Sequence, residues 1–445
     1  MIYKELRPIP ENIYQTFIDD SIGRNKQVIS FAASLCATDD NTSIAVDDVW
    51  GSGKTFFVKQ VQMVLEALSG FKSGDYTEEQ LKNVLNKISG YAEDNTEFNS
   101  LMPVYYDSWA YDNESDPVLS LILEIINATG QKYNKNHPDA AKAIAKIGAT
   151  VIKQFSGIDL TDISDVVSKL QGEDPFSTLR TQREIQKEMD SFLAEICKER
   201  GNKLVILVDE LDRCKPTFAI KLLERVKHYF TNEKVIFVFS VNGNELQHTI
   251  KRFYGEQYGA TRYLDRFFDV TVPLQPVNTK SFGQFIGGVS GSRVFYDVCE
   301  YVIERYNLSM REQIRFYRSL NHISQYADKQ NYAVQYSLIL AFPLAVGLRI
   351  VNRELFSEYI HGRLSSPFVE MMEKNECFGV ESMMGIDNNP NKEQINVTTE
   401  QMYNALFSHK YTSREYHLEI GKLHFDEDTR KRFLSVLASI PDTLK

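Results

Sequence analysis

Five short apolar runs along the chain have the length and residue types of buried β-strands. They cover Ser43–Val46, Met102–Tyr106, Lys203–Val208, Lys234–Val241 and Phe268–Leu274. Apolar runs without alternating polar residues are typical of strands that are covered on both faces. Helical patterns separate these runs, most clearly at Phe56–Leu68, Glu78–Tyr91 and Val118–Asn127. Because strands alternate with helices, we predict an α/β fold built on a parallel, doubly wound sheet.

The pattern changes beyond residue 280, and this change predicts the domain organisation. The chain has 445 residues, enough for about three domains or subdomains. We expect the sheet-containing core over residues 1–280, with a helical insertion at residues 137–177. The glycine-rich stretch Ser281–Ser292 is the expected hinge. A mostly helical lid should follow over residues 281–365, and then a C-terminal α or α+β region over residues 366–445, to which we assign no role.

Composition and charge narrow the function classes. Apolar residues make up 43% of the chain and charged residues 25%, which excludes a globally disordered or collagen-like chain. The formal net charge of −10 argues against binding nucleic acid through the whole surface. A local basic patch at Lys142, Lys146 and Lys153 of the expected insertion stays open.

Cysteine spacing and apolar segments indicate the cellular compartment in which the protein is expected. The five cysteines are scattered, and no two are spaced as a metal-binding pair, so we expect reduced, buried thiols in a cytoplasmic protein. The N-terminus shows no signal peptide. The most apolar stretch, Gln330–Leu348, is interrupted by Pro343 and has too short an unbroken apolar part for the roughly 20 residues that a spanning helix needs. We expect a buried helix there and no membrane span.

A glycine-rich turn, Asp48–Thr55 (DVWGSGKT), joins the first expected strand to the following helix. Apart from its first residue, it fits the phosphate-binding pattern GxxxxGK[ST], the Walker A motif, in which backbone N–H groups surround phosphates and the lysine reaches the β- and γ-phosphates. The threonine hydroxyl of this motif binds Mg²⁺. The predicted nucleotide-binding residues are therefore Gly51, Ser52, Gly53, Lys54 and Thr55.

Asp48 stands where this pattern has its first glycine. A carboxylate there would lie near the phosphates and weaken nucleotide binding unless it points away. We hypothesise that Asp48 impairs binding, and equal affinities for the chain and an Asp48→Gly variant would refute this.

Two carboxylates end the third apolar strand, which is typical of a Walker B motif. Asp209 is the predicted Mg²⁺ ligand, and Glu210 is the residue expected to orient and polarise the attacking water. Asp212 and Arg213 follow directly, either as a local ion pair or as contacts to a neighbouring subunit.

Four further polar residues could complete the site. Asn242 ends the fourth strand and could sense the γ-phosphate, or could simply be a turn residue before a glycine. Arg266, preferred over Arg262, precedes the last strand and could act on a nucleotide held by the next subunit. Arg24 lies at the place where many ATPases with these motifs close over the adenine. Arg311 begins a helix of the expected lid and could reach the phosphates.

Together these motifs resemble the KAP family of P-loop NTPases over roughly residues 15–325. The segments that carry the resemblance are VWGSGKT at 49–55, YDSW at 106–109, DELDRCKP at 209–216, FAIKLLERVKH at 218–228 and YLDRFF at 263–268. The resemblance implies an ATPase whose sheet has the additional-strand arrangement, with Lys54, Thr55, Asp209 and Glu210 in the family's usual roles.

The chain also departs from the family pattern. It has Asp48 in place of glycine, Asp107-Ser108 where an Asn-Ala pair is usual, and Asn242 where an aspartate is common. Many members carry transmembrane helices between the two Walker motifs, but residues 137–177 are too polar to span a bilayer. Soluble bacterial members are associated with defence against phage.

These observations lead to one main functional prediction and two alternatives. The main prediction is a Mg²⁺-dependent ATPase that works as a conformational switch or motor. It would act as a homo-oligomer together with a separate effector protein. GTP stays open as an alternative nucleotide. The first alternative is a nucleotide-gated scaffold with little hydrolysis, which Asp48 favours. The second is a DNA-stimulated ATPase, which the acidic composition opposes.

Overall fold

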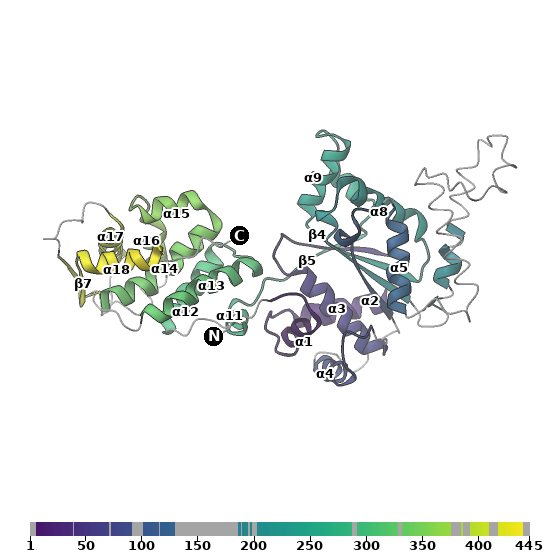
Figure 1. Ribbon diagram of the computed structural model, residues 1–445, viewed down its shortest axis with the longest axis horizontal. Coiled ribbons are helices and arrows are strands. Elements are labelled where there is room, and N and C mark those ends of the chain that lie inside the picture. The colour runs from purple at the N-terminus through teal and green to yellow at the C-terminus, as the bar shows by residue number, and fades with distance from the viewer. Residues whose placement is uncertain are drawn as a thin grey trace. The chain divides into compact units, whose positions relative to one another are not determined.

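The computed structural model describes most of the chain outside the expected insertion. The described residues are 6–38, 40–70, 73–90, 101–114, 116–129, 186–187, 189–194, 196–197, 203–286, 292–327, 332–374, 384–385, 392–408 and 417–438. The chain forms two compact units, one of Arg7–Pro276 and one of Met1–Leu6 with Val277–Lys445. Figure 1 labels the helices and strands of both units.

A five-stranded parallel sheet is the centre of the unit Arg7–Pro276. Its strands are β1 (Ser43–Asp47), β2 (Leu101–Asp107), β3 (Lys203–Asp209), β4 (Val235–Val241) and β5 (Val270–Pro273). They lie in the order β2-β3-β4-β1-β5, and all neighbours are parallel. The expected parallel sheet is confirmed. Because β4 lies between β1 and β3, the strands that carry the two Walker motifs are not adjacent, as the additional-strand arrangement requires.

Helices cover both faces of this sheet, which explains the uniformly apolar strands. Figure 1 shows α2 (Asn25–Ala37) and α3 (Lys54–Ser69) on one face, and α5 (Pro117–Thr129) and α8 (Pro216–Tyr229) on the other. Alternate β3 residues such as Leu204 and Ile206 join α5 and α8 in one hydrophobic cluster. The intervening residues of the strand, which end in Asp209, therefore face α3.

Shorter elements complete the unit Arg7–Pro276. They are α1 (Pro10–Ile18), α4 (Glu78–Ser89), the 3₁₀ turns η1 (Trp109–Tyr111) and η3 (Leu211–Arg213), α9 (Gly243–Tyr254) and α10 (Ala260–Leu264). The expected insertion at residues 137–177, with its lysines, lies outside the described residues.

The second unit is helical around one central helix. α14 (Tyr332–Val351) packs against α12 (Arg293–Arg305), α13 (Met310–Ala327), α15 (Arg353–Ile360) and α18 (Glu427–Ala438). By length and composition it is the one described helix that could cross a membrane, and most of its central residues are buried within the unit. The expected buried helix is confirmed. Pro343 does not interrupt it, because packing on all sides compensates for the single backbone hydrogen bond that proline removes.

The remaining elements of this unit are α11 (Thr279–Phe285), α16 (Ser366–Lys374), α17 (Lys392–Phe407) and the antiparallel pair β6 (Leu418–Ile420) and β7 (Leu423–Phe425). The boundary after Pro276 lies close to the predicted end of the core at residue 280. Residues 277–445 group as one unit, and the finer division at residue 365 stays a prediction.

The expected hinge at 281–292 is partly wrong, because its first residues belong to α11. Gly283 serves close packing there, since a Cβ would lie 2.6 Å from the Tyr317 hydroxyl oxygen. Residues 287–291 of that stretch lie outside the described residues. Cys36, Cys197, Cys214 and Cys299 are buried free thiols, as expected.

Candidate nucleotide-binding site

The predicted phosphate loop lies between the end of β1 and the start of α3. Gly51 and Gly53 have φ angles of 85° and 96°, in the left-handed region that favours glycine. Gly53 is also the N-cap of α3, so the helix begins directly at Lys54. The sequence therefore places glycine at the positions where the loop turns into the helix. This is the geometry that points backbone N–H groups at an anion.

Two buried cationic side chains, Lys54 and Arg24, donate hydrogen bonds to carbonyl groups of this loop. The Lys54 ammonium donates to the Asp48 carbonyl at 2.6 Å and to the Val49 carbonyl at 3.0 Å. The Arg24 guanidinium donates through Nη1 to the Ser52 carbonyl at 2.8 Å and through Nε to the Gln275 carbonyl at 2.5 Å. Arg24 thus ties the phosphate loop to the segment that follows β5. Its expected place beside an adenine stays a prediction.

Burial and nearby carboxylates act in opposite directions on these cations. Burial lowers the pKa of Arg24 to about 10, and Asp48 partly offsets this. Burial also lowers the pKa of Lys54, while Asp212, Asp209, Asp48 and Glu210 favour its charged form. The residues of both predicted Walker motifs therefore lie within electrostatic range of one ammonium group.

The Asp48 carboxylate turns back onto its own loop. Its Oδ1 accepts a hydrogen bond from the Val49 N–H at 2.7 Å, and its own N–H donates to the Val241 carbonyl at 3.2 Å. The carboxylate therefore occupies an N–H group that a glycine in its place would leave available.

The acidic end of β3 is held by the neighbouring strand β2. Asp209 is 1% exposed, and its Oδ2 accepts a hydrogen bond from the Tyr105 hydroxyl at 3.0 Å. Its Oδ1 accepts from the Glu210 N–H at 3.0 Å. Ser108 donates to the Asp209 carbonyl through both Oγ, at 2.7 Å, and its N–H, at 3.1 Å. The carboxylate and the backbone of Asp209 are thus both fixed.

Glu210 adopts a conformation that is uncommon for a residue with a side chain. Its φ is 60°, and it begins the turn η3. Its Oε2 lies 2.5 Å from Nε of Arg213, so Arg213 has a local partner. Burial and Asp209 raise the pKa of Glu210 to about 7, and Arg213 opposes the rise. A carboxyl group with such a pKa is suited to accept a proton near neutral pH.

Both tryptophans of the chain contact the turn η3. The Trp50 indole N–H donates to Asp212, and the Arg213 guanidinium lies 5.8 Å from the ring centre of Trp109. Trp50 is 45% exposed and Trp109 is 54% exposed. The sequence predicted neither contact, because the pairing of residues 50 and 212 depends on how β1 and β3 are placed in the sheet.

The end of β4 is organised around the start of α9. Asn242 is buried, and its Oδ1 accepts from the Glu245 N–H at 3.4 Å, so it caps α9. Asp47 accepts from the Gly243 N–H at 2.7 Å, and a Cβ on Gly243 would lie 2.7 Å from its Oδ2. Asn242 therefore has the turn role that the sequence left open. A role as γ-phosphate sensor stays a prediction.

Two further predicted site residues, Arg266 and Arg311, are exposed, each in its own unit. Arg266 follows α10 and is exposed, with no hydrogen bond or ion pair to its side chain in the described part of the chain. Arg311 is exposed in α13, which belongs to the other unit. Their proposed contacts with a nucleotide are untested.

The residues present fit a nucleotide with a divalent cation. Ser52 Oγ is buried in the phosphate loop without a partner among the described residues. No three His, Cys, Asp or Glu side chains of the described ranges gather into a metal site. The expected ligands from the protein are the Thr55 hydroxyl and the Asp209 carboxylate, which are hard oxygen donors. Mg²⁺ is commonly bound through one or two such groups together with phosphates and water.

Comparison with known proteins finds a family model, a relative and a solved structure that are similar to this chain. The model described as the KAP family P-loop domain matches residues 24–327. An uncharacterized protein of Methanocaldococcus jannaschii is 26% identical over 168 residues, which cover 30% of this chain and 86% of that protein. The Orc1 protein of Aeropyrum pernix, solved in complex with DNA, is 13% identical with a TM-score of 0.34, over 93% of this chain and 92% of that chain.

Proposed function

Since the chain belongs to the KAP family of P-loop NTPases, we propose that it is a Mg²⁺-dependent ATPase that couples hydrolysis to a conformational switch. One observation carries this proposal. The phosphate loop and the acidic end of β3 are in direct contact, because the Trp50 indole N–H donates to Asp212, and the nearby carboxylates favour the charged form of Lys54. A phosphate-loop lysine beside the carboxylates that follow a buried strand is the arrangement that P-loop NTPases use for phosphoryl transfer.

Each residue has a distinct part in the proposed reaction. The N–H groups of residues 51–55 bind the β- and γ-phosphates, and Lys54 exchanges the loop carbonyls for phosphate oxygens. Thr55 and Asp209 hold Mg²⁺, which supplies Lewis-acid stabilisation of charge on the phosphates. Glu210 takes a proton from the attacking water. The water oxygen bonds to the γ-phosphorus, and the bond between the γ-phosphorus and the bridging oxygen of the β-phosphate breaks. The products are ADP and phosphate, and the proton rests on Glu210 before release.

We also propose that the active form is a homo-oligomer in the cytoplasm. Arg266 is exposed beside α10 and would act on the nucleotide of a neighbouring copy, where an arginine stabilises the charge that develops in hydrolysis. The association of soluble bacterial family members with phage defence supports a role beside a separate effector protein.

A nucleotide-gated scaffold is the second candidate, and Asp48 favours it. Its carboxylate holds the Val49 N–H and adds negative charge close to where phosphates would bind. The ion pair with Arg213 also engages the carboxylate of Glu210, the proposed general base, and this contact would slow proton transfer. In this case nucleotide binding would be retained and turnover would be slow.

The substitution Glu210→Gln tests the proposed activity. It should leave nucleotide affinity within about twofold and lower single-turnover ATP hydrolysis about 10²–10⁴-fold, the usual contribution of a general base. Glu233→Gln, an exposed position at the opposite end of the sheet, is the matched control and should change neither quantity. Equal hydrolysis by both variants would contradict the role of Glu210. Tight binding with no measurable hydrolysis by the unaltered chain would favour the scaffold.

A further inference from the structure

Tyr105 connects the phosphate-loop helix to the acidic end of β3. Its hydroxyl donates to Asp209 Oδ2 at 3.0 Å. Its ring lies under the Lys59 ammonium, which is 4.4 Å from the ring centre. Lys59 belongs to α3, the helix that begins at Lys54 and Thr55. One side chain therefore contacts both elements that carry the expected metal ligands.

The surroundings of Tyr105 keep its hydroxyl available as a donor. The hydroxyl of Tyr105 is part-buried, and a tyrosine hydroxyl can donate one hydrogen bond. A part-buried hydroxyl that loses its partner carries a free-energy cost, and Asp209 Oδ2 is the acceptor that the structure provides. The hydrogen bond is therefore a stable feature of the folded unit.

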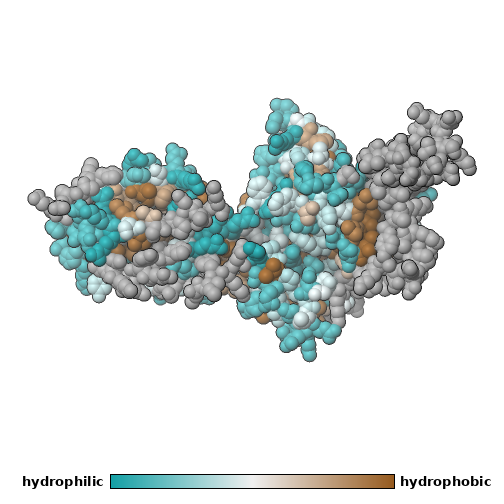
Figure 2. Space-filling model, viewed as in Figure 1, coloured by the Kyte–Doolittle hydropathy of each residue, from teal (hydrophilic) through white to brown (hydrophobic). Residues whose placement is uncertain are grey.

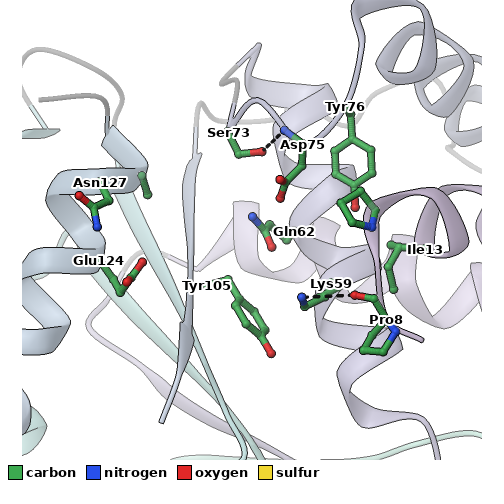
Figure 3. A pocket seen from close by; sticks show the side chains of 12 residues that line it. Pro8, Ile13, Lys59, Gln62, Ser73, Asp75, Tyr76, Tyr105, Glu124 and Asn127 are labelled. Atoms are coloured by element: carbon green, nitrogen blue, oxygen red, sulfur yellow. Dashed lines mark hydrogen bonds between the residues drawn. The ribbon is translucent and has the colours of Figure 1, made fainter. Parts of the chain in front are cut away.

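The other edge of the ring borders a cavity of about 280 Å³. Figure 3 shows Tyr105 and Lys59 along its wall, with Glu124 and Asn127 of α5 across from them. Beside this cavity the ring contacts the Lys59 ammonium, and its hydroxyl donates to Asp209. A residue whose main directional bond goes to a metal ligand is suited to orient that ligand.

We propose that Tyr105 is a positioning residue that orients the Asp209 carboxylate for the divalent cation of the bound nucleotide. This inference rests on the proposed function. The carboxylate has two oxygens, and each accepts one hydrogen bond, from Tyr105 and from the Glu210 N–H. Together they fix the plane of the carboxylate and leave its remaining lone pairs for a metal. Without the hydroxyl, Asp209 can rotate, and the metal loses a preoriented ligand.

The adjacent residue supplies a matched control. Tyr106 lies on the opposite face of β2, and its hydroxyl hydrogen-bonds Ser120 at 2.8 Å within the hydrophobic core. Tyr105→Phe and Tyr106→Phe each remove one hydroxyl from the same strand and retain the ring. They differ in which partner is lost, so a general effect of weakening β2 should appear in both variants.

The experiment measures Mn²⁺ binding by electron paramagnetic resonance, with the non-hydrolysable ATP analogue AMP-PNP on the full chain. Loss of an outer hydrogen-bond partner typically weakens metal affinity 10–100-fold. We expect Tyr105→Phe to weaken Mn²⁺ binding about tenfold and to leave analogue affinity without metal within about twofold. Tyr106→Phe should change neither quantity.

The outcomes separate this inference from the proposed function. Unchanged Mn²⁺ affinity in Tyr105→Phe, with normal binding by the original chain, would overturn the positioning role and leave the proposed function standing. Equal weakening by both variants would overturn it as well, because the effect would then come from the strand. No binding of analogue and Mn²⁺ by the original chain would refute the proposed function and the inference together.

Discussion

The two units of the chain differ in what they bury. The unit Arg7–Pro276 buries charged side chains, among them Arg24, Lys54, Glu66 and Asp209. In the described part of the second unit the one buried charged side chain is Arg430, which donates to the carbonyls at the end of α17. Apolar packing around α14 accounts for most of its core. Buried charge is costly, and three of these side chains, Arg24, Lys54 and Asp209, belong to or contact the two motifs, which indicates a functional site there.

Figure 2 shows a related contrast at the surface. Apolar patches appear on the visible face of both units among hydrophilic residues. At the nucleotide site the exposed apolar residues are Val49 and Trp50 of the phosphate loop, with Trp109 after β2. In the second unit they include Tyr332 and Val351 at the ends of α14. Two exposed aromatic residues of the first unit, Trp50 and Trp109, thus contact the turn η3, which follows the buried Asp209 along the chain.

The largest effect on ATP turnover is expected for Arg266, which is proposed to act on the nucleotide bound by a neighbouring copy of the chain. Arg266→Ala should lower ATP turnover about 10³-fold or more, the usual contribution of an arginine supplied by a partner, and should leave nucleotide binding unchanged. Arg262→Ala is the control, since Arg262 is also exposed and belongs to α10. Steady-state turnover and equilibrium binding are measured side by side. Loss of binding in Arg266→Ala, or equal loss of turnover in both variants, would contradict action across an interface.

Glu66 should make the stability of the first unit fall as pH rises toward neutrality. Burial raises the pKa of Glu66 from 4.5 to about 7, although Ser73 and Gln62 donate hydrogen bonds to it. A carboxyl pKa that is higher in the folded state than in the unfolded state lowers stability as pH rises from 4.5 to 7. The full effect is roughly 3 kcal/mol.

The variant Glu66→Gln should remove the part of the loss that comes from Glu66, while the part from Glu210, whose pKa is also raised to about 7, should remain. Urea unfolding at pH 5 and pH 8 should show a large decrease in the free energy of unfolding for the original chain and a smaller one for the variant. Glu79→Gln, at an exposed position of α4, should behave like the original chain. Parallel decreases for all three proteins would show that Glu66 is not the titrating group.

Gly347 tests whether apolar packing stabilises the second unit independently of the nucleotide site. A Cβ on this residue of α14 would lie 2.3 Å from Val302 Cγ1 of α12. Gly347→Ala should therefore destabilise the chain by about 1–3 kcal/mol, as overpacked cores do, and leave nucleotide affinity unchanged. The double variant Gly347→Ala/Val302→Ala should recover stability relative to Gly347→Ala, because it removes the clash. Thermal unfolding and nucleotide titration are the measurements, and a parallel loss of affinity would show that the two units are coupled.

The smallest effect is expected at Asp48. Asp48→Gly frees the Val49 N–H and removes a negative charge, so nucleotide affinity should rise by up to about tenfold, or about 1.4 kcal/mol. Asp48→Asn removes the charge and retains a carbonyl acceptor, and it should give an intermediate affinity. Calorimetric titration of the three proteins would separate the two contributions. Equal affinities would show that the carboxylate does not affect the phosphates.

The sequence predicted the sheet well because its strands are uniformly apolar and end in recognisable motifs. The observed strands β1–β5 agree with the five expected runs to within two residues at either end. The two motifs also predicted that Lys54, Asp209 and Glu210 belong to one nucleotide site. In the structure the carboxylates of Asp209 and Glu210 lie within electrostatic range of Lys54, and the roles of these residues stay predictions.

The contacts that were missed depend on tertiary placement. Nothing in the sequence around Tyr105 indicates that its hydroxyl reaches Asp209, because the register that aligns Asp107 with Asp209 forms only in the folded sheet. The alternation of side chains along β2 could have shown that Tyr105 and Tyr106 face opposite sides. The continuation of α14 through Pro343 likewise depends on neighbouring helices.

The most direct test of the account is steady-state phosphate release from ATP with Mg²⁺ by the full chain, beside Lys54→Ala and the control Lys82→Ala. Lys82 is exposed on α4, away from the phosphate loop. The account predicts turnover by the original chain and by Lys82→Ala, and at least about a hundredfold loss in Lys54→Ala. Equal turnover by all three proteins, or no turnover by the original chain and none after Asp48→Gly, would contradict it.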